Sequence, residues 1–447
     1  MNRRLIGFAL AVAALGGALP AVAQQAAPDT AAAGDDAPGR AAPAGGAVRL
    51  PGLAVTVRRS LFDPGLARSV ERWAPGDGTS AWQSLSDWLD ARGATSVRGF
   101  GGGGRQVLSI RGSRPEGVLV LLDGVPLNDP VTGTADLSTV SLASLASVTL
   151  VRGSGAARYG SGALAGALLL ESGAEGDGRS ARLAAGSFGR REASGRAGMG
   201  MGETSLELSA GLATAENDYP FENRLAPGSP VETRSGADHT SLWAGVGVRT
   251  DRLRANARLD DLERGIPGRS GTTAFAGSRW AERRASANAS YLLGRAALRA
   301  GVRRLGMTYT PGDGGEPARQ HATDIRAGAE GELPGPVPAL LALRFSAERL
   351  SGDAVADAPT RLAAGATLRH DLRLGGATAE AARFGLEPAL SVDVTRGASA
   401  ASPELGAWYR TGAGSRLYGR VGQAFRIPTF ADLHFEAAPG VRANADL

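Results

Sequence analysis

Apolar and polar residues alternate along most of the chain from about residue 178 onward. In 206–212, leucines and alanines take turns with glutamate, serine and glycine, and the same period of two recurs in 242–249, 253–260 and 284–293. Runs of about ten residues with this period are typical of transmembrane β-strands, which turn one side to lipid and the other to a polar lumen. A soluble β-sandwich also alternates, so the period alone leaves both folds open.

The connections between these strands differ in length. Short connections take turns with long polar ones; the short ones lie near 200–202, 250–251, 294–295 and 411–412, and the long ones near 214–239, 263–279 and 309–321. Outer-membrane barrels have this arrangement, with short periplasmic turns and longer external loops. We therefore predict an antiparallel transmembrane β-barrel over 178–447, with about thirteen strands.

A helix opens the pattern of a smaller domain, predicted over 58–175. Residues 81–91 place two tryptophans and two leucines on one helical face. Ser80 is the expected N-cap, and Gly93 follows directly after the expected last turn. The helix would therefore pack one apolar stripe against a neighbouring sheet.

Strands follow this helix, over 107–110, over 118–122 and, after a helical turn, within 137–151. The run 118–122 is apolar without interruption, which is typical of a strand covered on both faces. Asp123-Gly124 supplies a tight turn after it. The smaller domain is therefore predicted to be α/β.

The N-terminus carries an export signal. Arg3-Arg4 precede an apolar stretch that ends in Ala21-Val22-Ala23, a small-x-small cleavage site, so residues 1–23 are read as a signal peptide. Residues 24–52 are rich in Ala, Pro, Gly and Asp and cannot bury a core, so they form a disordered linker. No later window offers the roughly 20 apolar residues of a spanning helix.

Composition narrows the remaining function classes. The 447 residues include 65 Gly, no Cys and no Lys, so all 49 basic residues counted as Lys+Arg are arginines. Without Cys there are no structural disulfides, no thiol catalysis and no Cys-ligated metal centres. The formal net charge is only +5, and the arginines are scattered, which opposes a nucleic-acid footprint. No catalytic or metal-binding constellation is found, and we expect no enzyme activity.

The order of several short motifs in 97–172 is the most specific signal. They are Val97-Arg98-Gly99-Phe100, Ile110-Arg111-Gly112, the run 118–129 ending in Leu127-Asn128-Asp129, and the Gly-rich stretch 151–166. This series resembles the plug domain of TonB-dependent outer-membrane receptors. The resemblance implies a plug followed by a barrel in the outer membrane of a Gram-negative bacterium.

A short β-prone run precedes the plug and consists of Leu53, Ala54, Val55, Thr56 and Val57. Its position resembles that of the TonB box, the strand that a receptor offers to TonB. Edge pairing through backbone hydrogen bonds would provide the grip. The first strand of the plug is the alternative for the same residues.

Two plug arginines, Arg111 and Arg152, match the arginines in the family's Ile-Arg-Gly and Val-Arg-Gly turns. The resemblance implies that they pair with glutamates of the barrel wall and lock the plug to the barrel. A guanidinium fork suits a buried carboxylate. Solvated surface arginines are the alternative.

The end of the chain resembles the family again. Residues 422–433 look like the receptors' mid-barrel Phe-Arg-x-Pro-Thr segment, and 443–447 look like a later loop motif. Plugged transporters have roughly 22 strands, more than the pattern after residue 178 supplies. We therefore expect a C-terminally incomplete barrel, from a fragment or a truncated product; a naturally short barrel is the alternative.

The resemblance implies TonB-dependent import of a scarce, bulky nutrient, a ferric siderophore or cobalamin. The implied partners are the TonB-ExbB-ExbD complex, outer-membrane lipid and the nutrient, whose iron or cobalt would be cargo rather than a cofactor. A non-transporting truncated receptor and a porin- or adhesin-like surface barrel are the alternatives. The expected ligand-binding residues lie on plug turns and one external loop: Phe100, Arg105, Asn128, Asp129, Asp136, Tyr219 and Phe221.

Overall fold

The structure is a computed structural model that describes residues 70–75, 84–93, 95–99, 104–153, 159–173, 178–224, 227–267, 276–334, 339–353, 355, 358–375, 382–411 and 415–434. No helix within these ranges is long and apolar enough to cross a membrane. The predicted signal peptide (1–23), linker (24–52) and TonB box (53–57) lie outside the described residues.

The smaller domain is built on a five-stranded sheet with the order β1-β6-β7-β4-β5. Its strands are β1 (Val70–Trp73), β4 (Val118–Leu122), β5 (Val125–Pro126), β6 (Leu145–Arg152) and β7 (Gly166–Ser172). β4 and β7 are parallel, and the other pairs are antiparallel. A two-stranded sheet of β2 (Ser96–Gly99) and β3 (Gln106–Ser109) accompanies it, with 3-10 turns at Pro115–Gly117, Leu137–Thr139 and Leu142–Ser144.

Strand β4 is buried on both faces, as its unbroken apolar run predicts. Val118, Val120 and Leu122 belong to one hydrophobic cluster, together with the helix α2 (Leu85–Asp90). Leu119 and Leu121 belong to a second cluster on the opposite face. The turn after β4 is confirmed as well.

That turn needs left-handed backbone at two successive residues. Asp123 has a φ of 51° and Gly124 a φ of 83°. These angles fit the tight hairpin turn that Asp-Gly favours. β4 and β5 therefore pair in register on either side of it.

The helix starts later than expected. Ser84 is the N-cap of α2, its side chain accepts a hydrogen bond from the Asp87 backbone N–H, and the Asp87 side chain accepts one from the Ser84 backbone. This reciprocal capping box fixes the start of α2 at Leu85. The expected cap, Ser80, lies outside the described residues, whereas Gly93 follows the helix with a φ of 61°, as predicted.

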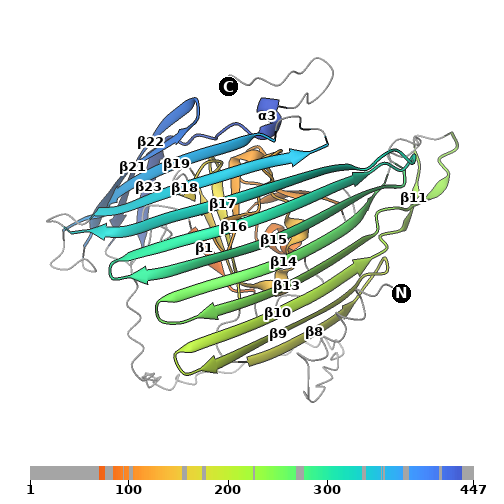
Figure 1. The fold of residues 1–447 in the computed structure, drawn as a ribbon, viewed down its shortest axis with the longest axis horizontal. Helices are drawn as coiled ribbons and strands as arrows, with labels where there is room; N and C mark the ends of the chain where they lie inside the picture. The colour runs from red at the N-terminus through yellow and green to blue at the C-terminus, as the bar shows by residue number, and fades with distance from the viewer. Residues whose placement is uncertain are drawn as a thin grey trace, which may run out of the picture. The chain divides into compact units, whose positions relative to one another are not determined.

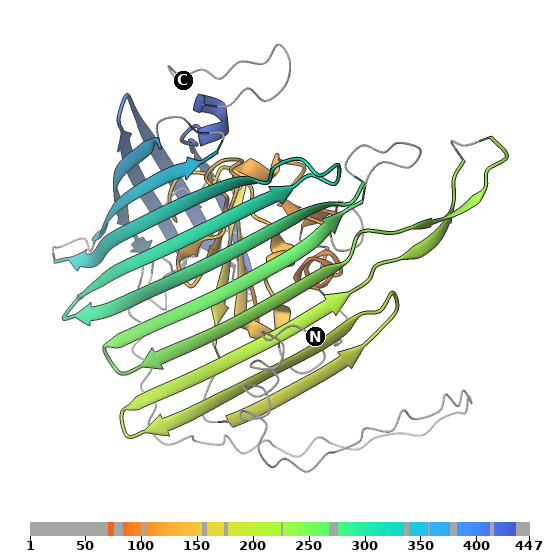
Figure 2. The same cartoon turned by 45° about the vertical axis from the view of Figure 1, so that its right-hand side comes forward.

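The region after residue 178 forms a 14-stranded antiparallel sheet in which β20 lies off the main path and pairs with β21 (Figures 1 and 2). Its strands are β8 (Gly178–Ala185), β9 (Arg191–Met201), β10 (Thr204–Ala215), β13 (His239–Arg249), β14 (Leu253–Ile266), β15 (Ser278–Leu293), β16 (Ala296–Thr310), β17 (Ala318–Leu333), β18 (Ala339–Gly352), β19 (Thr360–His370), β20 (Leu372–Leu374), β21 (Phe384–Thr395), β22 (Ala398–Arg410) and β23 (Arg416–Gly422). The thirteen strands expected from the alternation correspond to its main path.

The alternation sorts side chains onto two faces of this large sheet. The inner face, which contacts the smaller domain, carries buried residues such as Trp243 and Arg303, whereas the outer face carries exposed aliphatic residues such as Leu259 and Ile325. β8 and β23 are the two ends of the strand path and do not pair with each other in the described part of the chain. The sheet is therefore open, as the strand count predicts.

The connections follow the predicted pattern with two exceptions. The turns after β9, β13, β15 and β22 are short, but the link from β19 to β21 at the same end spans 371–383 and contains β20. The opposite end of the sheet carries longer connections, including the hairpin of β11 (Tyr219–Glu222) and β12 (Val231–Arg234). The link from β21 to β22 also lies at this end, but it spans only 396–397. We call this end the loop end.

Two glycines of the inner face make room for tryptophans on the next strand. Gly211 pairs with Trp243, and Gly385 pairs with Trp408. A Cβ atom at either glycine would collide with the indole ring of its partner. Trp243 and Trp408 are 5% and 1% exposed, so each indole is buried in the space that its glycine leaves.

Candidate functional site

The turn 126–136 of the plug-like domain is the centre of the candidate site, and Asn128 organises it. The Asn128 side chain accepts a hydrogen bond from the Val120 backbone N–H at 2.8 Å. Its amide group donates to the carbonyl oxygens of Val118 at 2.9 Å and Gly133 at 2.8 Å. Asn128 therefore joins β4 to the turn, and its amide is occupied by internal contacts.

Asp129 and Arg105 stabilise the same turn. The Asp129 carboxylate accepts hydrogen bonds from the Val131 N–H at 2.9 Å and the Thr132 hydroxyl at 3.0 Å. The Arg105 guanidinium donates to the Thr134 hydroxyl at 2.6 Å and to the Thr132 hydroxyl at 3.2 Å. The turn is therefore stabilised by its own Asp129 and, from the residue before β3, by Arg105, and ligand binding by Asp129 and Arg105 remains a prediction.

Asp136 connects the turn to the wall of the large sheet. It is 7% exposed and accepts hydrogen bonds from the backbone N–H groups of Gln106 and Ser138, both at 3.0 Å. Arg264 of β14 forms a 2.9 Å ion pair with the same carboxylate. An ion pair with both side chains this deeply buried is costly to break from one side. In this structure Asp136 is thus an anchor for the wall.

Two more inner-face arginines hold the plug-like domain. Arg284 of β15 donates to the Thr139 hydroxyl at 3.0 Å. Arg303 of β16, which is 1% exposed, donates to the carbonyl oxygens of Pro126 at 2.6 Å and Asn128 at 2.9 Å. Wall arginines thus donate to plug acceptors, the reverse of the pairing expected from the resemblance.

A chain of alternating charges continues from Arg303 across the neighbouring strands. The chain, which we call the inner ion relay, consists of Arg303 on β16, Asp324 and Arg326 on β17, Glu348 on β18 and Arg361 on β19. Asp324 lies 3.4 Å from Arg303 and 3.0 Å from Arg326. Glu348 lies 3.1 Å from Arg326 and pairs with Arg361. Each relay carboxylate therefore lies between two arginines.

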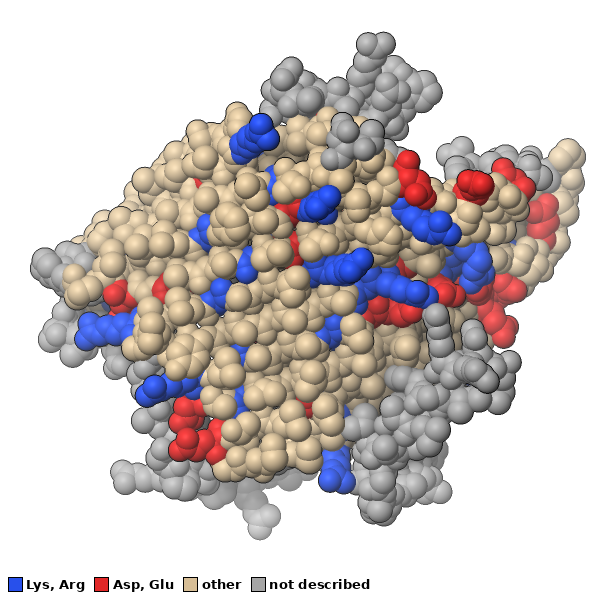
Figure 3. All heavy atoms as spheres, in the orientation of Figure 1, with Lys and Arg blue, Asp and Glu red and all other residues tan. Residues whose placement is uncertain are grey.

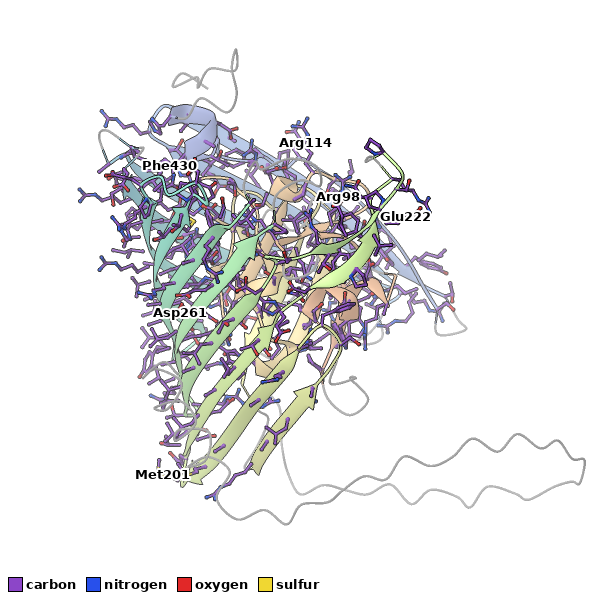
Figure 4. All side chains as sticks on the ribbon, turned by 90° about the vertical axis from the view of Figure 1, so that its right-hand side faces the viewer. Arg98, Arg114, Met201, Glu222, Asp261 and Phe430 are labelled. Atoms are coloured by element: carbon purple, nitrogen blue, oxygen red, sulfur yellow. The ribbon has the colours of Figure 1, made fainter. Side chains whose placement is uncertain are left out.

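The far end of the relay reaches the segment 427–433, which we call the strap. Arg361 donates to the Pro428 carbonyl oxygen and lies 4.8 Å from the centre of the Phe430 ring. Phe430 begins the short helix α3 (Phe430–His434) and is buried among Leu305, Leu350 and neighbouring residues. In Figure 4, Phe430 lies at the same end as Glu222 and opposite Met201, so the strap lies at the loop end.

The strap also contacts the plug-like domain directly. The backbone N–H groups of Phe430 and Ala431 donate to the carbonyl oxygens of Pro130 at 3.1 Å and Val131 at 3.0 Å. The Ile427 N–H donates to the Ser161 hydroxyl at 2.6 Å. The turn 126–136 is therefore held on one side by wall arginines and on the other by the strap.

The two arginines of the expected lock have different surroundings here. Arg152 forms an ion pair with Glu71 of β1, within the plug-like domain. Arg111 is exposed and has a φ of 53°, at the tip of a turn. A lock between these two arginines and wall glutamates remains a prediction.

The external residues of the predicted site form an aromatic group. The rings of Tyr219 and Phe221 on β11 lie 6.5 Å apart, and Phe188 lies 6.0 Å from Tyr219, both pairs edge to face. Tyr219 is 36% exposed. Tyr219 and Phe221 belong to the β11–β12 hairpin, which projects at the loop end (Figure 2), whereas Phe188 lies in the connection between β8 and β9. Phe100, the remaining expected residue, lies outside the described residues.

Two carboxyl groups outside the large sheet have shifted pKa values. Burial raises the pKa of Asp123, against the opposing effect of hydrogen bonds from the Ser172 side chain and backbone. The pKa of Asp432 is lowered: burial would raise it, but hydrogen bonds from Thr429 and the charge of Arg426 outweigh that effect. Asp432 and Thr429 form the reciprocal cap of α3, with the Asp432 N–H donating to the Thr429 hydroxyl at 3.1 Å.

Sequence reasoning missed Arg264, Arg284 and Arg303 as anchors. Arg284 falls on the polar side of the alternation described for 284–293, whereas Arg264 and Arg303 lie outside the stretches in which an alternation was described. Their partners are a distant carboxylate, a hydroxyl and two carbonyl oxygens. A carbonyl acceptor cannot be recognised in a sequence, because every residue has a backbone carbonyl group.

Residues 79–167 match the family model described as TonB-dependent Receptor Plug Domain. A segment of 175 residues is 29% identical to the vitamin B12 transporter BtuB of Vibrio cholerae, covering 37% of this chain and 28% of the transporter. The chain thus matches less than a third of that relative's length.

Solved structures share the fold over a larger part of the chain. A mutant of the ferric enterobactin receptor PfeA from Pseudomonas aeruginosa is 15% identical, with a TM-score of 0.64, over 84% of this chain and 64% of the receptor. The siderophore receptor PirA from Acinetobacter baumannii has a TM-score of 0.60 at 15% identity, over 80% of this chain and 61% of that receptor. The copper transporter OprC has a TM-score of 0.62 at 17% identity, over 84% of this chain and 68% of OprC.

Proposed function

Since this chain belongs to the TonB-dependent receptors of the outer membrane, we propose that it serves the TonB-energised import of a bulky, metal-bearing nutrient. The proposed cargo is a ferric siderophore or cobalamin, and the proposed energy source is the TonB-ExbB-ExbD complex. The loops and the plug turn 126–136 would meet the cargo from outside. A pull on the plug would then break the contacts that hold this turn in place.

The arrangement around the plug turn is the observation that carries this proposal. Arg264 and Arg303 reach the turn from the wall, and the strap reaches it from the other side. Each contact is a single hydrogen bond or ion pair, and none is covalent. Contacts of this kind can be broken and remade one at a time, so a plug held by them can shift when pulled and return.

The test is uptake of radiolabelled cargo by cells that express the full chain, with and without TonB. We expect uptake of one member of a panel of ferric siderophores, cobalamin and copper to require TonB. Uptake at the same rate without TonB would contradict energised import and favour a porin-like barrel. Binding of a panel member at the cell surface, measured in parallel, separates loss of transport from loss of recognition.

The TonB box gives a sharper version of this test. We expect Val55→Pro and Thr56→Pro to abolish uptake while surface binding persists, because proline removes a backbone donor and prevents strand pairing. Leu53→Ala is the matched control, since it retains every backbone donor. Normal uptake by both proline variants would place the box elsewhere in the chain.

A non-transporting receptor module is the second candidate, and the open sheet favours it. β8 and β23 end the strand path without pairing with each other among the described residues. In lipid, unpaired N–H and C=O groups at such edges cost several kcal/mol each. A heat-modifiable, protease-resistant band from outer membranes would contradict this candidate, and rapid degradation of the chain would support it.

A further inference from the structure

On the outer face of the large sheet, a row of apolar residues is followed directly by a row that contains arginines. Ala287, Val302, Ile325, Ala347 and Leu362 lie side by side on five neighbouring strands and form an apolar row. The next row toward the loop end is Ala285, Arg304, Thr323, Arg349 and Thr360. Arg304 and Arg349 thus lie one row from an apolar surface, on the side toward the loop end.

Further polar residues follow toward the loop end. The third row contains Arg283 and His321, and the fourth contains Arg319. Figure 3 shows basic side chains, with some acidic ones among them, in a band across this face. We call the surface of Arg283, Arg304, Arg319, His321 and Arg349 the outer arginine patch; all five side chains are exposed.

Acidic residues flank this patch on the β14 side and at the loop end. Asp261 forms a 3.1 Å ion pair with Arg283, and Asp353 accepts a hydrogen bond from the Arg319 backbone N–H at 2.8 Å. Glu263 is exposed one row above Asp261. Within the described residues, Arg304 and Arg349 have no carboxylate partner among the ion pairs of the structure.

The spacing of Arg304 and Arg349 suits a shared anion. They lie on either side of Thr323, on strands β16 and β18. Strands in a sheet are about 4.8 Å apart, so the two Cα atoms are roughly 10 Å apart. Two long side chains can converge across that gap on one phosphate, and guanidinium groups bind phosphate in a bidentate manner.

The free-energy cost of an arginine on the lipid-facing side of a barrel depends on its depth in the bilayer. On the lipid face of a barrel an arginine costs about 2–4 kcal/mol at the bilayer midplane and about 0–1 kcal/mol near the interface. The abrupt change from an apolar to an arginine-bearing row therefore marks the headgroup level. Since long connections lie outside in outer-membrane barrels, this level belongs to the outer leaflet.

We propose that the outer arginine patch binds the phosphate groups of the phosphorylated glycolipid in the outer leaflet, with Arg304 and Arg349 as the primary contacts. Thr323 donates its hydroxyl between them, and the apolar row below contacts the acyl chains. Lipid binding at this patch requires neither the transported cargo nor TonB, because the patch lies on the outer face of the wall and the plug lies on the inner face.

The experiment uses the full chain, excised from outer membranes in polymer-bounded nanodiscs and exchanged against defined lipids. The probes are diphosphorylated lipid A, dephosphorylated lipid A and phosphatidylglycerol, and bound lipid is counted by native mass spectrometry. We expect diphosphorylated lipid A to be retained at least tenfold better than the other two. We expect Arg304→Gln combined with Arg349→Gln to remove this preference.

Arg252→Gln is the matched control, because Arg252 is an exposed arginine in a short turn at the opposite end of β14. It should retain the preference. If the double Gln variant does not reach the membrane, the double Lys variant replaces it and should keep a phosphate-dependent preference. Equal retention of phosphorylated and dephosphorylated lipid A would overturn the proposal, as would a preference for phosphatidylglycerol or an unchanged double Gln variant.

Discussion

The plug domain and the large sheet bury opposite kinds of residue. The largest plug cluster consists of apolar side chains, including Trp88, Leu145 and Leu168, each fully buried. The inner face of the large sheet instead buries charges, among them Arg303 at 1% and Asp324 at 2% exposure. Many of its large aliphatic residues lie on the outer face, where Leu259 is 62% exposed, and the inner face keeps a smaller apolar cluster that includes Leu305 and Leu350.

The difference teaches that the hydrophobic pattern of a strand depends on what covers each of its two faces. In the plug, both faces of β4 are covered by protein, so both take apolar residues. In the large sheet, exposed apolar residues lie on the outer face, the face that outer-membrane barrels turn to lipid, and most of the buried charges lie on the inner face beside the plug. Contacts between the two regions are therefore made by hydrogen bonds and ion pairs rather than by apolar packing alone.

A large-to-small substitution in the plug core should have the largest effect on stability. We expect Trp88→Ala to destabilise the plug by about 3–5 kcal/mol, because it leaves a large cavity in a close-packed core. The matched change on the outer face, Leu362→Ala, should have a smaller effect, since Leu362 is 50% exposed. Protease protection of the plug in isolated membranes measures both. Equal protection of the two variants would mean that the plug core is not close-packed.

Loss of one wall anchor should have an intermediate effect. Arg303→Met removes two hydrogen bonds to plug carbonyl oxygens and leaves Asp324 paired with Arg326. Hydrogen bonds that involve a charged group contribute about 1.5–3 kcal/mol, so we expect faster hydrogen exchange in the turn 126–136. The neighbouring change Arg304→Met alters a side chain on the other face and should leave exchange in this turn unchanged. Equal exchange rates in the turn 126–136 of both variants would contradict the role of Arg303 as an anchor of this turn.

Loss of the strap's cap should have a smaller effect. We expect Thr429→Ala to destabilise α3 by about 0.5–2 kcal/mol, because it removes the N-cap hydroxyl. Thr429→Ser retains the hydroxyl and serves as the control. Hydrogen exchange at Phe430 and Ala431 reports whether the strap still donates to the plug. Slow exchange in the alanine variant would indicate that the strap is held by Phe430 alone.

A pH effect on the plug should be the smallest. Burial raises the pKa of Asp123, so the folded plug binds this proton more tightly than the unfolded chain. This contribution to stability is fully present below the unfolded pKa, about 3.9, and is lost as the pH rises through the folded value. Asp123→Asn should remove the dependence, as measured by thermal unfolding of the plug at several pH values. A dependence of the same sign in Asp123→Asn would assign it to another group.

Prediction from sequence worked where local pattern decides the structure. The unbroken apolar run of β4, the Asp123-Gly124 turn and the short connections of the large sheet were all predicted, because each depends on neighbours in sequence. The helix start was misplaced because Ser80 and Ser84 are both suitable N-cap residues, and the contact of Ser84 with Asp87 is what identifies the cap. The contact between Arg264 and Asp136 joins residues 128 positions apart, so no local pattern encodes it.

The same limit applies to the expected ligand-binding residues. Asn128, Asp129 and Asp136 were predicted from their place in a turn that faces the barrel mouth in the family. In the structure their polar groups hold the turn and its contact with the wall. A sequence places a side chain in a turn, but whether its polar atoms serve the fold or a ligand depends on partners brought in by tertiary structure.

The glycine–tryptophan pairs of the inner face restrict how this sequence can change over evolutionary time. Gly211 cannot gain a side chain while Trp243 lies across it, and Trp243 cannot shrink without leaving a void beside Gly211. A substitution at either position alone is expected to destabilise the sheet. The two positions should therefore change together, with a larger residue at one accompanied by a smaller residue at the other. Gly385 and Trp408 form a second such unit, and among diverged relatives each pair should be inherited as a single two-residue character.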